Sequence, residues 1–66
     1  MPKFKVGDLI QNLRHGEYRI VLESRTYEYV IYRFGYRSGI RRLNCGYIER
    51  SYKLVREDNE KEEQNS

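Results

Sequence analysis

The segment 33–42 combines arginine, tyrosine and glycine in a pattern that suits an anionic partner. Four arginines and one tyrosine flank two glycines within ten residues. Arginine guanidinium groups neutralise phosphates and release condensed counterions, and a tyrosine at a loop tip can stack on a base. Glycine lets the backbone approach a phosphate closely. The pattern therefore predicts nucleic-acid contacts from five side chains: Arg33, Tyr36, Arg37, Arg41 and Arg42.

An alternative interpretation is a solvated hairpin whose arginines pair with carboxylates of the same chain, namely those of the acidic C-terminal residues and Glu17, Glu28 and Glu49. Strand alternation adds a constraint, because it puts Arg41 and Arg42 on opposite faces. If Leu43 points inward, Arg41 points inward too or lies at the rim. Arg42 is then the safer surface contact.

Tyrosine is unusually dense, with seven residues in 66. In a strand over 27–34, Tyr27 and Tyr29 share one face with Ile31 and Arg33. This face predicts a stacking platform continuous with the arginine segment, or an anchor for a protein partner, since tyrosine and arginine dominate protein–protein hot spots. Alternatively, the tyrosines fill a small β core. Arg25, in the turn that precedes this strand, is included among the predicted contacts.

The residue types give little support to catalysis. His15 is the only histidine and Cys45 the only cysteine. Arg41 or Arg42 could lower the pKa of the Cys45 thiol, but a small buried hydrophobic side chain is the simpler interpretation. One His and one Cys cannot complete a zinc site, and no glycine-rich phosphate loop is present. The sequence therefore predicts a protein that is not an enzyme and has no metal or cofactor.

Charge is distributed unevenly along the chain. Residues 1–56 carry 12 Lys and Arg and 5 Asp and Glu, whereas residues 57–66 carry five acids and a single lysine. The formal net charge of +3 thus hides a basic body and an acidic tail, a pattern that indicates charged partners. The tail has no large apolar residue and is expected to be disordered. The chain is divided into a folded domain, 1–56, and a tail, 57–66, which would serve solubility or compete for the basic face.

The apolar residues stand in short runs with a period of two, broken by turn residues, which predicts strands. The expected strands cover 9–13, 18–23, 27–34, 40–45 and 52–55, with one helical turn at 46–51 and a turn with positive φ at Gly16. Five short strands predict an all-β fold, a closed or nearly closed barrel that leaves no exposed edge. The expected core consists of Val6, Ile10, Ile20, Leu22, Val30, Tyr32, Leu43, Ile48, Tyr52 and Leu54.

Two segments resemble parts of a known type of small barrel. Residues 4–10, Phe-Lys-Val-Gly-Asp-Leu-Ile, are similar to the opening of SH3-like barrels, and residues 52–55, Tyr-Lys-Leu-Val, to their closing strand. Over residues 4–55 the chain resembles short SH3-like proteins of bacteriophages and prophages, mostly of unknown role. The resemblance implies a five-stranded SH3-like barrel, a phage origin and expression in a bacterial cytoplasm. Small phage proteins of this kind often bind and redirect host machinery.

These observations favour a binding protein whose first predicted partner is nucleic acid, recognised mainly through phosphate charge. The alternative is a phage protein that binds and modulates a host protein of the transcription, nucleoid or proteolysis machinery. The sequence has no signal peptide and no membrane-spanning apolar stretch, and its single cysteine allows no internal disulfide, so we expect a cytoplasmic protein without a membrane partner. A domain this small is expected to be a monomer or a weak homodimer.

Overall fold

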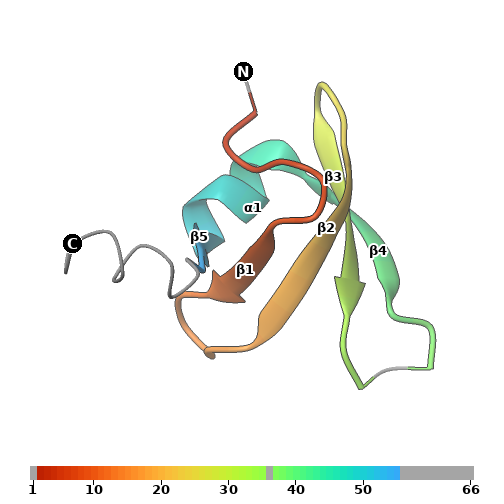
Figure 1. Ribbon diagram of the computed structural model, residues 1–66. Coiled ribbons are helices and arrows are strands. Elements are labelled where there is room, and N and C mark those ends of the chain that lie inside the picture. Colours follow the sequence, from red (N-terminus) through yellow and green to blue (C-terminus); the bar gives the residue numbers. More distant parts are fainter. Residues whose placement is uncertain (1, 36, 56–66) are drawn as a thin grey trace, which may run out of the picture.

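The computed structural model describes residues 2–35 and 37–55, which form one antiparallel sheet and one short helix (Figure 1). The strands are β1 (Leu9–Asn12), β2 (Tyr18–Ser24), β3 (Glu28–Arg33), β4 (Ile40–Asn44) and β5 (Tyr52–Leu54), and the helix α1 (Cys45–Ser51) lies between the last two. The strand order is β4-β3-β2-β1-β5, so the last strand lies beside the first. The predicted acidic tail, 57–66, lies outside the described residues.

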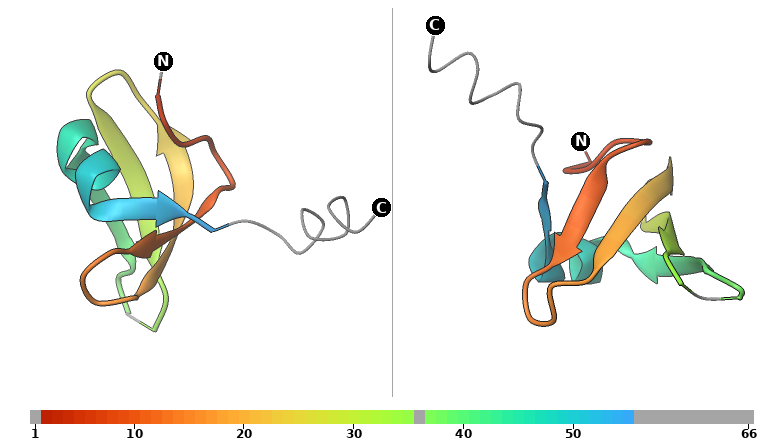
Figure 2. Two further views of the ribbon diagram at one scale, coloured as in Figure 1. Left: turned by 90° about the vertical axis from the view of Figure 1, so that its left-hand side faces the viewer. Right: turned by 60° about the horizontal axis from the view of Figure 1, so that its bottom comes forward.

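The five expected strands and the helical turn are confirmed, with each boundary within one residue of its predicted place. The expectation of a closed barrel is wrong, because the sheet is open and has β4 and β5 as its two edges. The seven-residue helix explains the opening, since it follows β4, precedes β5 and contacts both. It also contacts β3, so it packs against the sheet beside both edge strands. The right-hand view of Figure 2 shows β4 and β5 at opposite ends of the sheet.

Asn44 makes the connection from β4 into α1. Its side-chain oxygen accepts a hydrogen bond of 3.3 Å from the backbone N–H of Tyr47, which caps the first turn. One turn later Ile48 is fully buried, and the chain leaves the helix in an extended conformation at Tyr52. The helix therefore covers one face of the sheet. We call this the helix face and the opposite one the open face.

The main core lies on the helix face. It consists of Phe4, Ile10, Val21, Tyr29, Ile31, Ile48 and Tyr52, with Leu43, Cys45 and Leu54 packed against it. This confirms the predicted burial of Ile10, Ile48 and Tyr52, and it places Leu43 and Leu54 at the margin of the core. The expectation for Val6 is wrong, because this side chain is 65 % exposed. Phe4, which lies earlier in the same N-terminal segment, is buried instead.

In β2 and β3 the predicted burial of Val30 is confirmed, but the predicted phase of the core is wrong. The sequence predicts that the even-numbered side chains of both strands point inward, but Val21 and Ile31, which pair across the two strands, are the fully buried ones. Alternation then puts the even-numbered residues on the open face. Its apolar members are Tyr18, Ile20, Leu22, Val30, Tyr32, Phe34 and Ile40. Of these, Val30 is buried by its neighbours, at 6 % exposure, whereas Leu22 is 38 % exposed.

Tyr29 connects β3 to the helix on the helix face of the sheet. Its hydroxyl donates a hydrogen bond of 2.6 Å to Oε2 of Glu49 in α1 and accepts one of 3.1 Å from the backbone N–H of Phe4. The rings of Phe4 and Tyr29 pack with their centroids 5.8 Å apart. Burial, reinforced by the bond to Glu49, raises the pKa of Tyr29. The same bond, followed by one from the backbone N–H of Lys3, lowers the pKa of Glu49.

Replacing Tyr29 by Phe keeps the ring and removes the hydroxyl, and we expect this to cost about 1–3 kcal/mol of unfolding free energy near neutral pH. The folded-state pKa of Glu49 is lowered, so its contribution is present above its ordinary pKa of 4.5 and is lost as the pH falls through the folded value. The pKa of Tyr29 is raised, so its contribution is present below 10.0 and is lost as the pH rises through the folded value. The loss of unfolding free energy caused by Tyr29→Phe should therefore become smaller at low pH and at high pH.

Urea denaturation of the wild type and of Tyr29→Phe across this pH range measures the effect. Tyr27→Phe is the matched control, because Tyr27 is 80 % exposed and its hydroxyl makes no hydrogen bond within the described residues. A cost of Tyr29→Phe that stays constant with pH would contradict the assignment.

Candidate functional site

Three arginines from three neighbouring strands share the helix face. Arg19 of β2 lies directly opposite Arg33 of β3. Arg41 of β4 pairs with Ile31, which puts it diagonally across from Arg33. The Cβ atoms of residues directly opposite each other lie about 5 Å apart, and diagonal neighbours lie about 7–8 Å apart. We call Arg19, Arg33 and Arg41 the arginine cluster.

The arginine cluster lines a pocket of about 460 Å³. The rest of the wall consists of Ile31, Leu43, Asn44, Tyr47 and Tyr52. Tyr52 is buried, whereas Tyr47 is 46 % exposed, and the Asn44 cap holds the helical turn from which Tyr47 projects. The pocket thus combines three guanidinium groups with an apolar floor and an accessible aromatic ring.

Arg19 is buried despite its charge, with 9 % of its side chain exposed. Its Nη2 lies 3.0 Å from Oε1 of Glu17, and its Nη1 donates to the carbonyl oxygen of Tyr18 at 2.9 Å. Its Nε is buried and has no hydrogen-bond partner among residues 2–35 and 37–55. A buried guanidinium beside two further arginines is unfavourable, because like charges repel strongly away from water. An anion in the pocket would reduce this repulsion.

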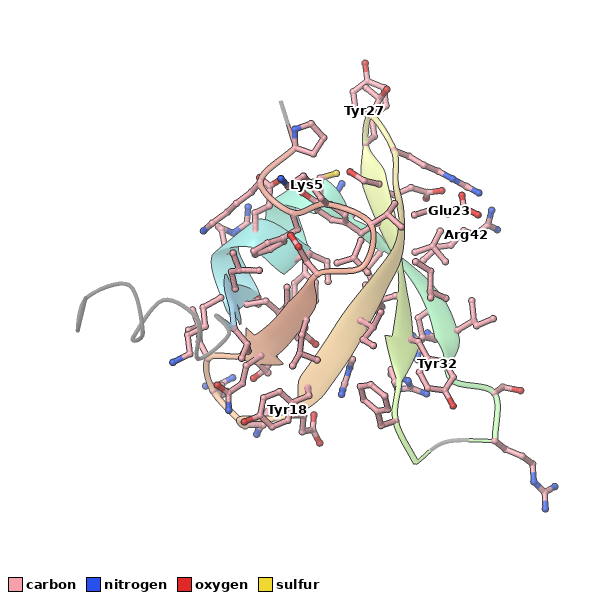
Figure 3. All side chains as sticks on the ribbon, viewed as in Figure 1. Lys5, Tyr18, Glu23, Tyr27, Tyr32 and Arg42 are labelled. Atoms are coloured by element: carbon pink, nitrogen blue, oxygen red, sulfur yellow. The ribbon has the colours of Figure 1, made fainter. Side chains whose placement is uncertain are left out.

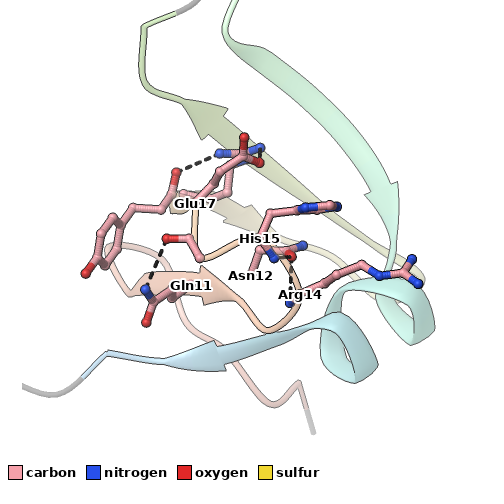
Figure 4. A network of polar contacts seen from close by, with 8 residues as sticks. Gln11, Asn12, Arg14, His15 and Glu17 are labelled. Carbon is pink, nitrogen blue, oxygen red and sulfur yellow. Dashed lines mark hydrogen bonds and ion pairs between the residues drawn. The ribbon is translucent and has the colours of Figure 1, made fainter.

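The β1–β2 turn holds Glu17 next to Arg19. Oδ1 of Asn12 accepts hydrogen bonds of 2.9 and 2.7 Å from the backbone N–H groups of residues 14 and 15, and Nε2 of Gln11 donates to the carbonyl oxygen of Gly16 at 3.0 Å (Figure 4). Gly16 has a φ of 77°, a conformation that favours glycine, which confirms the predicted turn. The turn is therefore rigidly specified, and it provides a carboxylate at one end of the arginine cluster.

The structure separates the arginines that the sequence places in one segment. Arg33 and Arg41 line the pocket, whereas Arg42 is exposed on the open face. Alternation is confirmed, but the preference for Arg42 over Arg41 as the accessible contact is not, because both are exposed. Arg37 is exposed in the β3–β4 connection. Tyr36, the predicted stacking residue, lies outside the described residues.

The predicted tyrosine platform is wrong. Tyr29, Ile31 and Arg33 do share a face, but Tyr29 and Ile31 form part of the core and are fully buried. Tyr29 therefore cannot stack on a ligand. Tyr27 is highly exposed, just before β3, and is not among the residues that line the pocket of the arginine cluster.

Arg25, which lies outside the segment 33–42, pairs with carboxylates of the same chain. Its guanidinium lies 2.6 Å from Glu23 and 2.9 Å from Glu28. The hydrogen bond to Glu23, followed by that to Glu28, raises the pKa of Arg25. Within residues 2–35 and 37–55, by contrast, Arg41 and Arg42 form no ion pair.

The two residues considered for catalysis, Cys45 and His15, are not among the residues that line the pocket of the arginine cluster. Cys45 is partly buried, with its thiol directed at the backbone carbonyl oxygens of Arg25 and Thr26 at 3.6 and 3.8 Å. Burial raises the pKa of this thiol, the opposite of what a nucleophile requires. His15 lies in the β1–β2 turn. In the described part of the chain, no group of three or more His, Cys, Asp or Glu residues could hold a metal ion. Nor does that part contain a helix of the length and hydropathy that would cross a bilayer.

Sequence reasoning missed Arg19 and Tyr47. Arg19 was overlooked because Tyr18, Ile20 and Leu22 form the more apolar alternation in β2, which assigns Arg19 to solvent. The pairing of Val21 with Ile31 reverses that assignment and brings Arg19 to the face of Arg33. No local signal distinguishes the two phases. Tyr47 could have been found from the Asn44 cap, which fixes the direction of the first helical turn.

No protein-family model matches the sequence, and no curated protein and no solved structure matches it either.

Proposed function

We propose that this protein binds nucleic acid through the pocket of the arginine cluster and does not catalyse a reaction. The observation that carries the proposal is the convergence of Arg19, Arg33 and Arg41 on one pocket beside the exposed ring of Tyr47. Guanidinium groups bind phosphate oxygens in a two-pronged geometry, and a tyrosine ring stacks on a base. The likeness to SH3-like phage proteins, and the bacterial cytoplasm that it implies, belong to the same proposal.

Charge and shape favour a single strand over a duplex. The described residues carry eleven Lys and Arg against five Asp and Glu, an excess that attracts polyanions. The arginines, however, lie in a pocket and not on a flat ridge. A pocket of this size can accept one unstacked nucleotide, whereas the bases of a duplex remain stacked and out of reach of Tyr47.

Binding to a short labelled single strand is expected to be strongly salt-dependent. Each phosphate contact on a single strand contributes about −0.7 to the slope of log K against log salt, so three arginine contacts predict a slope of about −2. Fluorescence anisotropy with an oligothymidine too short to span two protein molecules measures the slope, and a duplex of equal length serves as the comparison. Binding that is absent, or that is unaffected by salt, would rule out the proposal.

Arg41 and Arg42 provide a matched pair of substitutions. Both are exposed, adjacent and unpaired within the described chain, but only Arg41 lines the pocket. Arg41→Gln is expected to weaken binding of the short strand by about 1.5 kcal/mol, roughly tenfold, and to reduce the salt slope by about 0.7. Arg42→Gln removes the same charge and should have a far smaller effect. Equal losses from both variants would show that general charge, and not the pocket, accounts for binding.

The second candidate function is binding of a host protein, and the open edge of the sheet favours it. β4 pairs with β3 on one side only, and its residues are exposed or half-buried. An extended segment of a partner could add to this edge as a further strand. A pull-down from nuclease-treated bacterial lysate separates the candidates. Partners that all disappear with nuclease support nucleic acid, and a protein retained after nuclease supports this second function.

A further inference from the structure

The open face carries apolar side chains that no other element of residues 2–35 and 37–55 covers. Ile40 is 62 % exposed, Phe34 48 % and Tyr18 46 %. Figure 3 shows Tyr32 and Arg42 on the side of the sheet away from α1. A large contiguous apolar surface on a small protein usually marks an interaction site.

Register organises the open face into rows centred on β3. In one row Tyr32 of β3 lies between Ile20 of β2 and Ile40 of β4, so the row is apolar from end to end. The ring of Phe34 packs edge-on against Tyr32, with centroids 5.4 Å apart, and extends the apolar surface toward β2. The row continues past Ile20 to Leu9 of β1, and within its β2–β3–β4 part Tyr32 has an isoleucine on either side.

The neighbouring row carries opposite charges at its two ends. Val30 of β3 lies between Glu23 of β2 and Arg42 of β4. A β-bulge between Val21 and Glu23 shifts the register of β2, and Glu23 thereby comes to the same face as Arg42 (Figure 3). The carboxylate and the guanidinium are thus placed symmetrically about β3, with an apolar residue between them.

We propose that the open face binds a second copy of this chain, face to face, about a two-fold axis parallel to β3. Such an axis places β3 over β3 and β2 of each copy over β4 of the other. Glu23 of each copy then faces Arg42 of the other, which gives two symmetric ion pairs. In the apolar row, Ile20 meets Ile40 and Tyr32 meets its own equivalent. The face is therefore complementary to itself in both charge and hydropathy.

The side chains can make these contacts. Packed sheets stand about 10 Å apart, a gap that an arginine and a glutamate span together. Arg25 already contacts Oε1 of Glu23, at 2.6 Å from Nη2 and 2.8 Å from Nε, but the side chain of Glu23 is 55 % exposed and has a second carboxylate oxygen for the arginine of the other copy. Edge-to-edge pairing of two β4 strands is the less favourable arrangement, because it brings Arg41 and Arg42 of both copies together at one seam.

Burial of the open face would also increase the buried apolar surface of this small domain, and with it the stability of the fold. One sheet with a single seven-residue helix buries a modest share of its apolar surface, and small domains gain stability from association. The arginine cluster lies on the helix face and points away from the proposed interface. Association and ligand binding therefore use opposite sides of the sheet, and this inference does not depend on the proposed function.

Sedimentation equilibrium of the full chain in reducing buffer tests the inference. The wild type is expected to dimerise with increasing concentration. Glu23→Arg and Arg42→Glu each place like charges together and should weaken the dimer at least about tenfold. The double variant, with the charges exchanged, should restore it. An equimolar mixture of the two single variants should associate as well, because each then meets an opposite charge.

Two further variants keep the result unambiguous. Ile40→Lys should abolish the dimer, and the high exposure of Ile40 means that the fold itself is spared. Arg14→Glu changes the charge as Arg42→Glu does, but in the β1–β2 turn, and should leave the dimer intact. Three outcomes would overturn the inference: a wild type that remains monomeric, a dimer unaffected by Glu23→Arg, or a double variant that fails to recover. The second of these would indicate pairing through the β4 edge.

Discussion

One short helix has to cover a sheet that is apolar on both faces, and the remainder of the structure follows from which face it takes. The hydroxyl of Tyr29 links β3 to Glu49 in α1 and to the backbone of Phe4, so the helix and the N-terminal segment close over the odd-numbered side chains of β2 and β3. Within the described residues, this leaves Tyr32, Ile40 and their neighbours uncovered. It also draws Arg19 into a buried position, because Arg19 shares its face with Val21.

The burial of Arg19 is a local conflict in an otherwise consistent fold. Its Nε has no partner in the described part of the chain, and the guanidinium lies opposite Arg33, with Glu17 as its one ion-pair partner there. Burying such a charge with incomplete hydrogen bonding reduces stability. Conflicts of this kind between local preference and global fold concentrate at functional sites. Glu17 offsets part of the charge of Arg19 and keeps the pocket organised without filling it. The cluster that we propose as a phosphate site is therefore held by strands and not by flexible loops.

Much of the fold could be predicted from the sequence, because turn residues and short apolar runs determine where strands begin and end. All five strands and the helix lie where those signals put them. The phase of β2 and β3 could not be predicted in the same way. Both alternations are apolar, and the choice depends on Tyr29 reaching Glu49, which is 20 residues away in the chain. The same choice changes the candidate site, because it buries Tyr29 in the core and brings Arg19 to the face of Arg33. The separation of Arg41 from Arg42, by contrast, follows from strand alternation and could be predicted. The prediction of a closed barrel was wrong for a related reason. Where α1 packs against the sheet depends on the tertiary fold, which local sequence signals do not show.

The central claim is that the arginine cluster, and not the basic charge as a whole, receives the ligand. Titration of the labelled protein with a short single strand, followed through the arginine Nε–H resonances and the backbone amides in NMR spectra, observes this directly. The account predicts that the Nε–H signals of Arg19 and Arg41 and the amide of Tyr47 move together and saturate, while the amides of Ile40 and Arg42 respond little. Shifts that concentrate on the open face, or that spread evenly over all arginines, would contradict it.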